Sequence, residues 1–470
     1  DNPTGRALAR RLLKPRIPYT DVHDYQLEAL CKMMDGIDVL ATIKTGAGKS
    51  AYFYMFIMLL HAFLEDQSLQ EVLKRPVPQN PCMVVIYPTN GLEVEQEATF
   101  RSYGLRALAI NQDTLQDARS RGEDLWNASS NGVSLLLLGP EQLTSKGFEK
   151  LLQTKQFKDR VVGLGIDEVH LLDTWGSGFR IAFKQIGHVR ARLPTRVVEI
   201  CVTATAVQGD PLDRICRFAG LKAGQYHRIH RSNARSELRL LFRPLKHGLG
   251  GWEFPDLHWV VEEGRNILIF VQTIAIQFRL VAYLFRQLSG SRNANLERIR
   301  MYNSMGYSEY NKKTRDLLRN PEHQGVICVA TSCLLVGISL PGIRDVIFAG
   351  NPSNADDLMQ GGGRADRLGL FGDGRIIVYY SEKAMKQARD LVDTPISTRR
   401  TLKSKSHTHQ ADPLDITMAR LLLADCKTAE QNSIYDNPSE DAPCLCGSCV
   451  GQTPSSQTPP ICACSGCTPE

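Results

Sequence analysis

The stretch Ile37-Asp-Val-Leu-Ala-Thr-Ile-Lys-Thr-Gly-Ala-Gly-Lys-Ser50 identifies the fold class of this chain. Its first half is an apolar run typical of a buried strand, and the apolar segment after Ser50 predicts a helix. The glycine-rich loop between them, residues 44–50, offers backbone N–H groups and a helix N-terminus to a phosphate. A strand, a phosphate-binding loop and a helix in this order predict an α/β protein.

Similar apolar, β-branched runs recur along the chain, with helical stretches between them. Continuous runs suit strands buried on both faces, and intervening helices imply parallel sheets. We predict two such sheets, in domains at residues 1–225 and 226–400, and a small cysteine-rich module at 401–470. The joining stretch, residues 206–235, carries no strong strand signal. The other predicted strands are residues 83–87, 133–138, 161–166, 197–202, 267–271, 326–330, 346–348 and 376–380.

The composition is that of an ordinary soluble globular protein, with 43% hydrophobic and 23% charged residues. The 56 Lys and Arg exceed the 50 Asp and Glu by a net charge of +6, which permits an anionic partner without requiring one. The longest apolar run, residues 51–60, is too short to cross a bilayer, so we expect no membrane partner. The chain starts at Asp1 without a visible signal peptide, and we expect it to be part of a longer protein.

Two side chains of the loop carry the chemistry of nucleotide binding. Lys49 is expected to reach the β- and γ-phosphates, and Ser50 to ligate Mg²⁺. The strict motif has glycine where Ile43 stands, so this is a relaxed form of the pattern. The alternative, a glycine-rich turn with a solvated lysine, fits poorly with a position between a strand and a helix. The backbone expected around the phosphates is that of Thr45, Gly46, Ala47 and Gly48.

Two adjacent carboxylates, Asp167 and Glu168, end the apolar run at residues 161–166. Such a pair at the end of a buried strand costs free energy unless a cation meets it. We expect Asp167 to hold Mg²⁺ through water, and Glu168 to orient or deprotonate the attacking water. Alone, the pair is more often a solvated strand end; together with the loop at 44–50 it indicates an ATPase.

Two arginines, Arg364 and Arg367, follow the glycines of Gln360-Gly-Gly-Gly-Arg-Ala-Asp-Arg367. Their spacing places them on one helix face. An arginine that meets the γ-phosphate from a second domain stabilises the transition state and couples hydrolysis to domain closure. The alternative is a basic surface helix after a loop.

The order of these motifs resembles that of superfamily 2 helicases, and further matches point to the RecQ family. The segment His170-Leu-Leu-Asp-Thr-Trp-Gly-Ser-Gly-Phe-Arg180 is similar to the aromatic-rich loop of RecQ helicases. Arg231-Ser-Asn233 resembles the link between their two RecA-like domains, and the whole resemblance covers roughly residues 20–450. The remaining matches are Gln26, Pro88-Thr89, Pro140-Glu141, Thr203-Ala-Thr205 and Thr331.

The resemblance implies an ATP-dependent DNA helicase with 3′→5′ polarity, acting on single-stranded and partly duplex DNA. It also implies an intracellular, nuclear protein of DNA repair and recombination, in which Gln26 reads the adenine. Aromatic side chains in a loop can stack on bases without reading their sequence, whereas core packing is the alternative for them. The residues implied to couple nucleic acid to hydrolysis are His170, Trp175, Phe179, Arg180, Thr203, Thr205 and Thr331.

Four positions depart from the family pattern. His23 stands where an arginine near the adenine is usual, which implies an altered nucleotide affinity or selectivity. Leu335 replaces a usual glycine, and Ser339 a usual Asn or Asp. Asp366 replaces a glycine between the two arginines, and we expect its carboxylate to pair with one of them and weaken it.

The cysteines are concentrated at the end of the chain, with two copies of a Cys-x-Cys-x₂-Cys pattern at residues 444–449 and 462–467. A chain with a full core has little need of disulfides, so these cysteines are interpreted as metal ligands. The first copy resembles three ligands of the four-cysteine zinc site of RecQ helicases. We expect a zinc ion on Cys426, Cys444, Cys446 and Cys449.

Alternatives to this ligand set stay open. One of Cys462, Cys464 or Cys467 competes with Cys426 for the fourth position, and a disordered cysteine-rich tail is a further possibility. The three tail cysteines have no obvious fourth partner, for which His407 or His409 is a candidate. Two zinc ions per chain would indicate a second site.

The preferred hypothesis is therefore a RecQ-like DNA helicase core with ATP, Mg²⁺ and Zn²⁺ as cofactors. An RNA-stimulated ATPase or helicase of the same superfamily is the second hypothesis. The third is a nucleic-acid-binding scaffold in which the altered residues at 335, 339 and 366 have weakened the motor.

Overall fold

The structure is a computed structural model that describes residues 1–19, 21–70, 73, 76–174, 185–289, 296–335, 338–394, 414–450 and 462–469. The chain divides into two compact units. Unit 1 comprises Asp1–Asn233 with Pro438–Pro459, and unit 2 comprises Ala234–Asn437 with Pro460–Glu470. The division thus falls at 233/234 instead of the predicted 225/226. Within the predicted module at 401–470, the described residues are divided between the two units, 438–450 belonging to unit 1 and 414–437 and 462–469 to unit 2.

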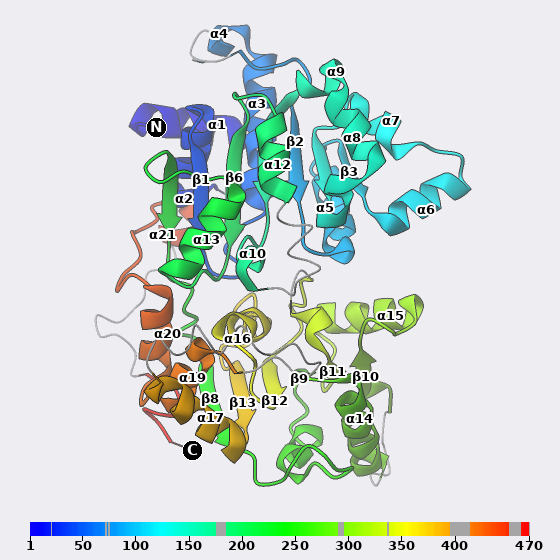
Figure 1. Cartoon of the computed structure of the whole chain (residues 1–470), viewed down its shortest axis with the longest axis vertical. Coiled ribbons are helices and arrows are strands. Elements are labelled where there is room, and N and C mark those ends of the chain that lie inside the picture. Colours follow the sequence, from blue (N-terminus) through cyan, green and yellow to red (C-terminus); the bar gives the residue numbers. More distant parts are fainter. Residues whose placement is uncertain are drawn as a thin grey trace. The chain divides into compact units, whose positions relative to one another are not determined.

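Unit 1 is built on seven parallel strands in the order β3-β4-β2-β5-β6-β1-β7 (Figure 1). Parallel neighbours need long crossover connections, and the helices between the strands supply them. The strands are β1 (Asp38–Thr42), β2 (Cys82–Ile86), β3 (Ala107–Ile110), β4 (Leu135–Leu138), β5 (Val161–Ile166), β6 (Val198–Thr203) and β7 (Tyr226–His230).

Side chains of the central strands alternate between two apolar cores, one on each face of this sheet. Val39 and Ala41 of β1 pack with α1 (Pro3–Leu13), α2 (Asp24–Met34), α3 (Ala51–Glu65) and α5 (Asn90–Ser102). Leu40 belongs to the opposite core, with α8 (Lys146–Gln153), α9 (Lys155–Lys158), α12 (Gln185–Arg192) and α13 (Asp210–Ala219). The other helices of unit 1 are α4 (Gln67–Gln70), α6 (Gln112–Ser120), α7 (Leu125–Ser130), η1 (Pro140–Thr144), α10 (Leu171–Thr174) and α21 (Gly447–Val450).

Unit 2 repeats the architecture with six parallel strands in the order β10-β11-β9-β12-β13-β8 (Figure 1). The strands are β8 (Arg239–Pro244), β9 (Ile267–Val271), β10 (Ile299–Tyr302), β11 (Ile327–Ala330), β12 (Asp345–Ala349) and β13 (Arg375–Tyr380). The helices are η2 (Pro255–Val261), α14 (Ile274–Ser289), η3 (Leu296–Arg298), α15 (Ser308–Arg319), η4 (Ser332–Leu334), α16 (Ala355–Gly362), α17 (Glu382–Asp393), α19 (Ile416–Leu423) and α20 (Lys427–Tyr435).

The predicted fold class is confirmed: the chain contains two parallel-sheet domains of the RecA-like kind. All nine predicted strands are present, with small shifts at their ends. The four strands that were not predicted, β3, β7, β8 and β10, are the four edge strands of the two sheets. One of them, β7, lies in the stretch 206–235 that was expected to contain no strong strand, and within it Ile229 alone is fully buried.

Candidate nucleotide and metal sites

The loop at residues 44–50 follows the carboxyl end of β1 and precedes α3. Gly46 and Gly48 have φ values of 88° and 79°. An L side chain rarely adopts this left-handed conformation, so the two glycines allow the loop to turn back over the start of the helix. Glycines with positive φ are typical of loops that turn their backbone N–H groups toward a phosphate, which agrees with the predicted role.

Helix α2 supports this loop from the side. The Gln26 side chain, 1% exposed, donates from Nε2 to the Gly48 carbonyl at 3.2 Å, and the Tyr25 hydroxyl donates to the Ala47 carbonyl at 3.0 Å. A Cβ at position 48 would lie 2.7 Å from Gln26 Nε2, a second reason for glycine there. Gln26 is also tied to the helix start, because its Oε1 accepts from the His23 amide at 3.2 Å. The predicted adenine-reading residue is thus held directly against the phosphate loop.

The two predicted carboxylates lie at the carboxyl end of β5, and both are buried. Lys49 Nζ lies 3.4 Å from Glu168 Oε1, so the lysine compensates the buried carboxylate. The Asp167 Oδ1 accepts from the Glu168 amide at 2.9 Å. Ser50 and Asp167 supply oxygen donors, the type that Mg²⁺ prefers, so the residues present fit this cofactor.

A chain of contacts continues from this carboxylate to the end of β6. His170 Nδ1 lies 3.4 Å from Glu168 Oε2 and 2.9 Å from Thr203 Oγ1. The Thr203 hydroxyl donates to the Thr205 carbonyl at 2.8 Å and accepts from the Thr205 amide at 3.1 Å. Since the threonine proton is used in this way, the Nδ1 atom of His170 carries the hydrogen toward Thr203. Five of the predicted residues, from Lys49 to Thr205, are therefore brought together in unit 1.

Burial lowers the pKa of His170 to about 4, against the opposing effect of the Glu168 carboxylate. In the unfolded chain the imidazole has its ordinary pKa of about 6.5, so between these values only the unfolded state takes up the proton. The stabilisation is complete above pH 6.5 and is lost as the pH falls toward 4, by up to about 3 kcal/mol. We expect the thermal unfolding temperature of the whole chain to fall in this window, and to fall less in a His170→Gln variant. Calorimetry at pH 7 and pH 5 makes the comparison; equal losses in both proteins would contradict it.

The aromatic-rich loop expected to contact nucleic acid cannot be placed. Trp175, Phe179 and Arg180 fall outside the described residues, within the segment 175–184. Their role therefore stays a prediction of the sequence.

The two predicted arginine fingers of unit 2 differ in their surroundings. Arg364 is 3% exposed; its guanidinium donates to the Leu335 carbonyl at 2.9 Å from Nη2, and to the Ile338 carbonyl from Nη1. Arg367 is only half-buried, and its Nη1 lies 3.4 Å from the same Ile338 carbonyl. The Arg364 guanidinium thus donates to backbone carbonyls of its own unit, whereas the Arg367 side chain is more exposed to solvent.

The expectation that Asp366 pairs with one of these arginines is not borne out by its contacts. Its carboxylate accepts from the amides of Phe371 at 3.1 Å and Gly372 at 2.8 Å. Asp366 has a φ of 36°, which explains why glycine is usual at this position. Its carboxylate therefore stabilises a turn. Thr331, at the end of β11, contacts Cys333 through its hydroxyl at 3.4 Å.

The cysteines form two separate groups with metal-ligand spacing. We call the first, His23 with Cys444, Cys446 and Cys449, the His–Cys₃ cluster; it lies in unit 1. The second, the Cys₄ cluster, lies in unit 2 and consists of Cys426, Cys462, Cys464 and Cys467. Cys426, the predicted fourth ligand, lies with the second copy of the cysteine pattern, and His23 lies with the three cysteines of the first. His407 and His409 lie outside the described residues.

Sequence reasoning noted His23 only as a substitution near the adenine. It is separated from Cys446 by 423 positions, and a histidine has no spacing rule over such a distance. The one available signal was the repeat itself, because each copy supplies three ligands and a tetrahedral site needs a fourth.

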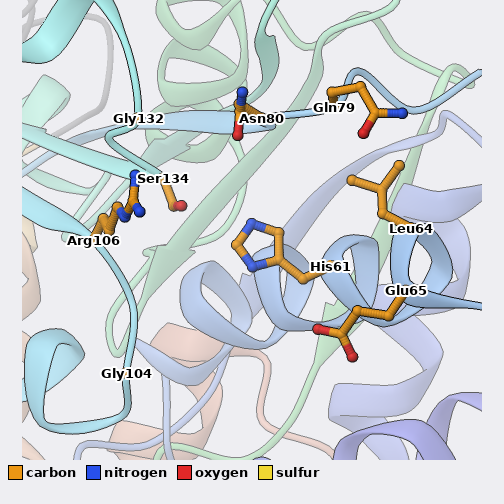
Figure 2. A pocket seen from close by; sticks show the side chains of 9 residues that line it. All are labelled: His61, Leu64, Glu65, Gln79, Asn80, Gly104, Arg106, Gly132 and Ser134. Atoms are coloured by element: carbon orange, nitrogen blue, oxygen red, sulfur yellow. The ribbon is translucent and has the colours of Figure 1, made fainter.

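A separate pocket of about 330 Å³ opens at the end of the unit 1 sheet where the strands begin, opposite their carboxyl ends (Figure 2). His61 of α3 lines it, together with Asn80, Arg106 and Ser134, which precede β2, β3 and β4. Ligands of parallel α/β sheets bind where the strands end, and here the strands begin. This pocket is therefore distinct from the candidate nucleotide site.

Two family models match the chain. A DEAD/DEAH box helicase domain matches residues 23–212, and a helicase conserved C-terminal domain matches residues 253–369. With the two RecA-like sheets and the loop, carboxylate and arginine motifs in this order, the chain is a superfamily 2 helicase. Its curated relatives include RecQ helicases, which confirms the resemblance noted in the sequence.

Three curated relatives illustrate the similarity. The putative ATP-dependent DNA helicase Q1 of Caenorhabditis briggsae is 24% identical over 382 residues, 79% of this chain and 55% of its own. The ATP-dependent DNA helicase RecQ of Bacillus subtilis is 25% identical over 368 residues, 78% and 56% of the two chains. The putative ATP-dependent RNA helicase R290 of Acanthamoeba polyphaga mimivirus is 24% identical over 360 residues, 77% and 58%. The chain thus spans little more than half the length of these relatives.

A solved structure supports the fold. The helicase Lhr of Mycobacterium smegmatis, bound to single-stranded DNA and AMP-PNP, matches with a TM-score of 0.59 at 18% identity. The match covers 94% of this chain and 57% of that one. Among the described residues, no helix combines the length and hydropathy that crossing a membrane requires.

Proposed function

We propose that this chain is the motor core of a RecQ-type DNA helicase, which hydrolyses ATP·Mg²⁺ to move 3′→5′ along single-stranded DNA and separate duplex strands. The observation that carries the proposal is the contact chain from Lys49 through Glu168 and His170 to Thr203. It connects the residue expected at the γ-phosphate with a residue expected to relay to nucleic acid. A domain that only stored a nucleotide would have no use for such a connection.

Within unit 1 the proposed roles follow from the contacts. Gln26 reads the adenine, and the backbone of residues 45–48 with Lys49 holds the phosphates. Lys49 exchanges its contact with Glu168 for the phosphates when ATP binds, which leaves the carboxylate able to orient the attacking water. Bound Mg²⁺ neutralises phosphate charge, and Ser50 and Asp167 would hold it.

Unit 2 supplies the response to ATP. We propose that Arg367 meets the γ-phosphate when the domains close, while Arg364 holds the backbone carbonyls of Leu335 and Ile338 in place. ATP then favours the closed state because the arginine contact exists only there, and hydrolysis allows the domains to separate again. Alternating closure and opening with different grips on DNA gives directed movement.

The proposal is tested by steady-state ATP hydrolysis with no nucleic acid, with single-stranded DNA and with RNA of the same sequence. We expect strong stimulation by DNA and little by RNA. Duplexes with a 3′ or a 5′ single-stranded tail then test polarity, and only the 3′-tailed duplex should be unwound. A Glu168→Gln variant, which should bind ATP and DNA without turnover, serves as the control for contaminating ATPases.

The second candidate is an RNA-stimulated ATPase. The relative R290 is named as an RNA helicase, and the Asp-Glu-Val-His box is compatible with either nucleic acid. Stimulation by RNA equal to or greater than that by DNA would favour it. The absence of stimulation by either, with ATP still bound, would favour a scaffold with a weakened motor. A nuclear location stays a prediction of the sequence.

A further inference from the structure

We infer that the chain holds two zinc ions at separate sites, and that the first of them positions the adenine-reading helix α2. The first site is the His–Cys₃ cluster of unit 1, and the second is the Cys₄ cluster of unit 2. The part that concerns adenine rests on the proposed nucleotide binding; the two sites themselves do not.

The interatomic distances fit tetrahedral zinc. With Zn–S bonds of about 2.3 Å and Zn–N bonds of about 2.0 Å, neighbouring sulfurs lie about 3.8 Å apart, and a nitrogen lies about 3.5 Å from each sulfur. His23 Nδ1 lies 3.3, 3.8 and 3.4 Å from the sulfurs of Cys446, Cys444 and Cys449. A shared ion explains why one ring nitrogen faces three thiols at once, since a single N–H can donate to only one of them well.

The Cys₄ cluster shows the same spacing. Cys426 Sγ lies 3.8 Å from Cys462 Sγ and 3.9 Å from Cys464 Sγ. A disulfide requires about 2.05 Å, so these are not disulfide pairs, and all seven cysteines of the two clusters are free thiols. Both sets consist of the soft sulfur and imidazole donors that zinc prefers.

The first site is joined to the nucleotide loop through two residues. His23 is the N-cap of α2, and its amide donates to Gln26 Oε1 at 3.2 Å. Gln26 in turn donates to the Gly48 carbonyl at 3.2 Å. The Asp24 amide donates to Cys444 Sγ at 3.3 Å, and the Leu445 amide donates to Asp24 Oδ2 at 2.5 Å, so the cysteine segment and the helix start hold each other. A zinc ion here fixes the imidazole, and with it the first turn that carries Gln26.

The cysteine segment of the first site has a second anchor in unit 1. Arg231 donates to the Ala442 carbonyl at 2.8 Å and pairs with Asp441 at 3.2 Å, while its guanidinium lies 4.8 Å from the centre of the Tyr25 ring. The Ser232 amide donates to the Asp441 carboxylate at 2.8 Å. These contacts hold the segment before Cys444 against unit 1, next to α2, so the fold of unit 1 brings the four residues of the His–Cys₃ cluster together.

The second site fastens the end of the chain to an edge of the unit 2 sheet. The Ser465 amide donates to the Leu240 carbonyl of β8 at 3.0 Å, and the Phe242 amide donates to Ser465 Oγ at 2.9 Å. An exposed edge strand is open to unwanted pairing, and these contacts use two of its free backbone groups. The backbone at Gly466 lies close to that of Asp425, because a Cβ on Gly466 would be 1.6 Å from the Asp425 carbonyl oxygen. The ion thus ties Cys426, next to Asp425, to the segment that covers β8.

Metal analysis of the purified full chain tests the two sites without any need for activity. We expect two zinc ions per chain, with an X-ray absorption signature of seven sulfurs and one nitrogen shared between them. His23→Ala and Cys464→Ser should each reduce the content to one, whereas the matched control Cys216→Ser, a free cysteine outside both clusters, should keep two. His23→Cys should also keep two zinc ions, with a signature of sulfur alone.

The proposed effect of the first zinc ion on α2 is tested separately, by nucleotide binding. Binding of a fluorescent ATP analogue to His23→Ala should be weakened about 10-fold, the equivalent of one lost hydrogen bond, and His23→Cys should restore it. One zinc ion in the wild-type chain, or loss of both ions in every variant, would overturn the pair of sites. Two zinc ions in the wild-type chain, one in His23→Ala, and an unchanged affinity of His23→Ala for the ATP analogue would overturn only the proposed effect on α2. If no variant folds, the wild-type absorption signature decides: an all-sulfur signature would exclude His23 as a ligand.

Discussion

In a Lys49→Ala variant, ATP turnover at saturating single-stranded DNA is expected to fall by about 100- to 1,000-fold. The ammonium group is the cation that would stabilise charge on the transferred phosphate, and no other lysine of the loop lies in its position. In the structure it also compensates Glu168, which is 7% exposed, at 3.4 Å. Without the lysine, this carboxylate loses its cation before ATP arrives, so both nucleotide binding and catalysis suffer.

The measurement is steady-state hydrolysis together with strand separation, and DNA binding is followed by fluorescence anisotropy. Unwinding should disappear while DNA affinity changes little, because Lys49 is expected to contact only the nucleotide. Lys155→Ala, an exposed lysine of α9, is the matched control and should keep full turnover. Retained unwinding by Lys49→Ala would refute the mechanism.

Replacing the two arginines of unit 2 one at a time should give different defects. We expect Arg367→Ala to lower turnover by about 1,000-fold, the usual contribution of an arginine finger, with no change in unfolding. We expect Arg364→Ala to destabilise unit 2 by about 2 to 4 kcal/mol, because it removes a buried guanidinium that donates to the carbonyls of Leu335 and Ile338 and leaves Ile338 only the 3.4 Å contact of Arg367.

Calorimetry and ATP hydrolysis on the same preparations separate the two effects. Arg389→Ala, an exposed arginine of α17, should change neither quantity. If Arg367→Ala unfolds early and Arg364→Ala is stable but inactive, the roles of the two arginines are reversed. This outcome would make the buried guanidinium the one that moves toward the phosphate.

The hydrophobic pattern of the sequence was sufficient to predict the central strands of each sheet. Strands β2 and β5 are buried along their whole length and consist of apolar residues and glycine, so each run is visible without a structure. The edge strands β3, β7, β8 and β10 have one neighbour each, and polar residues are tolerated there. β7 reads Tyr-His-Arg-Ile-His and cannot be recognised from hydrophobicity alone.

Local motifs also determined most of the nucleotide site. The loop at 44–50 and the carboxylates Asp167 and Glu168 depend on residues adjacent in sequence. The structure places them at the carboxyl ends of β1 and β5, the two strands that flank β6 in one sheet. The turn around Asp366 was misjudged because a carboxylate beside two arginines suggests an ion pair. Only the backbone, with its φ of 36°, directs this side chain to the amides of Phe371 and Gly372.

The candidate metal ligands show which part of a site the sequence reveals and which part only the tertiary structure reveals. Each Cys-x-Cys-x₂-Cys copy is a local pattern that is visible in the sequence alone, although only the first copy was predicted to bind zinc. The structure adds a fourth donor to each copy, His23 to one and Cys426 to the other, and neither is adjacent to its copy in sequence. No spacing rule links His23 to a cysteine 423 positions away. Only the packing of the cysteine segment against α2 brings His23 beside the three cysteines, where it could complete the four donors that a tetrahedral site needs.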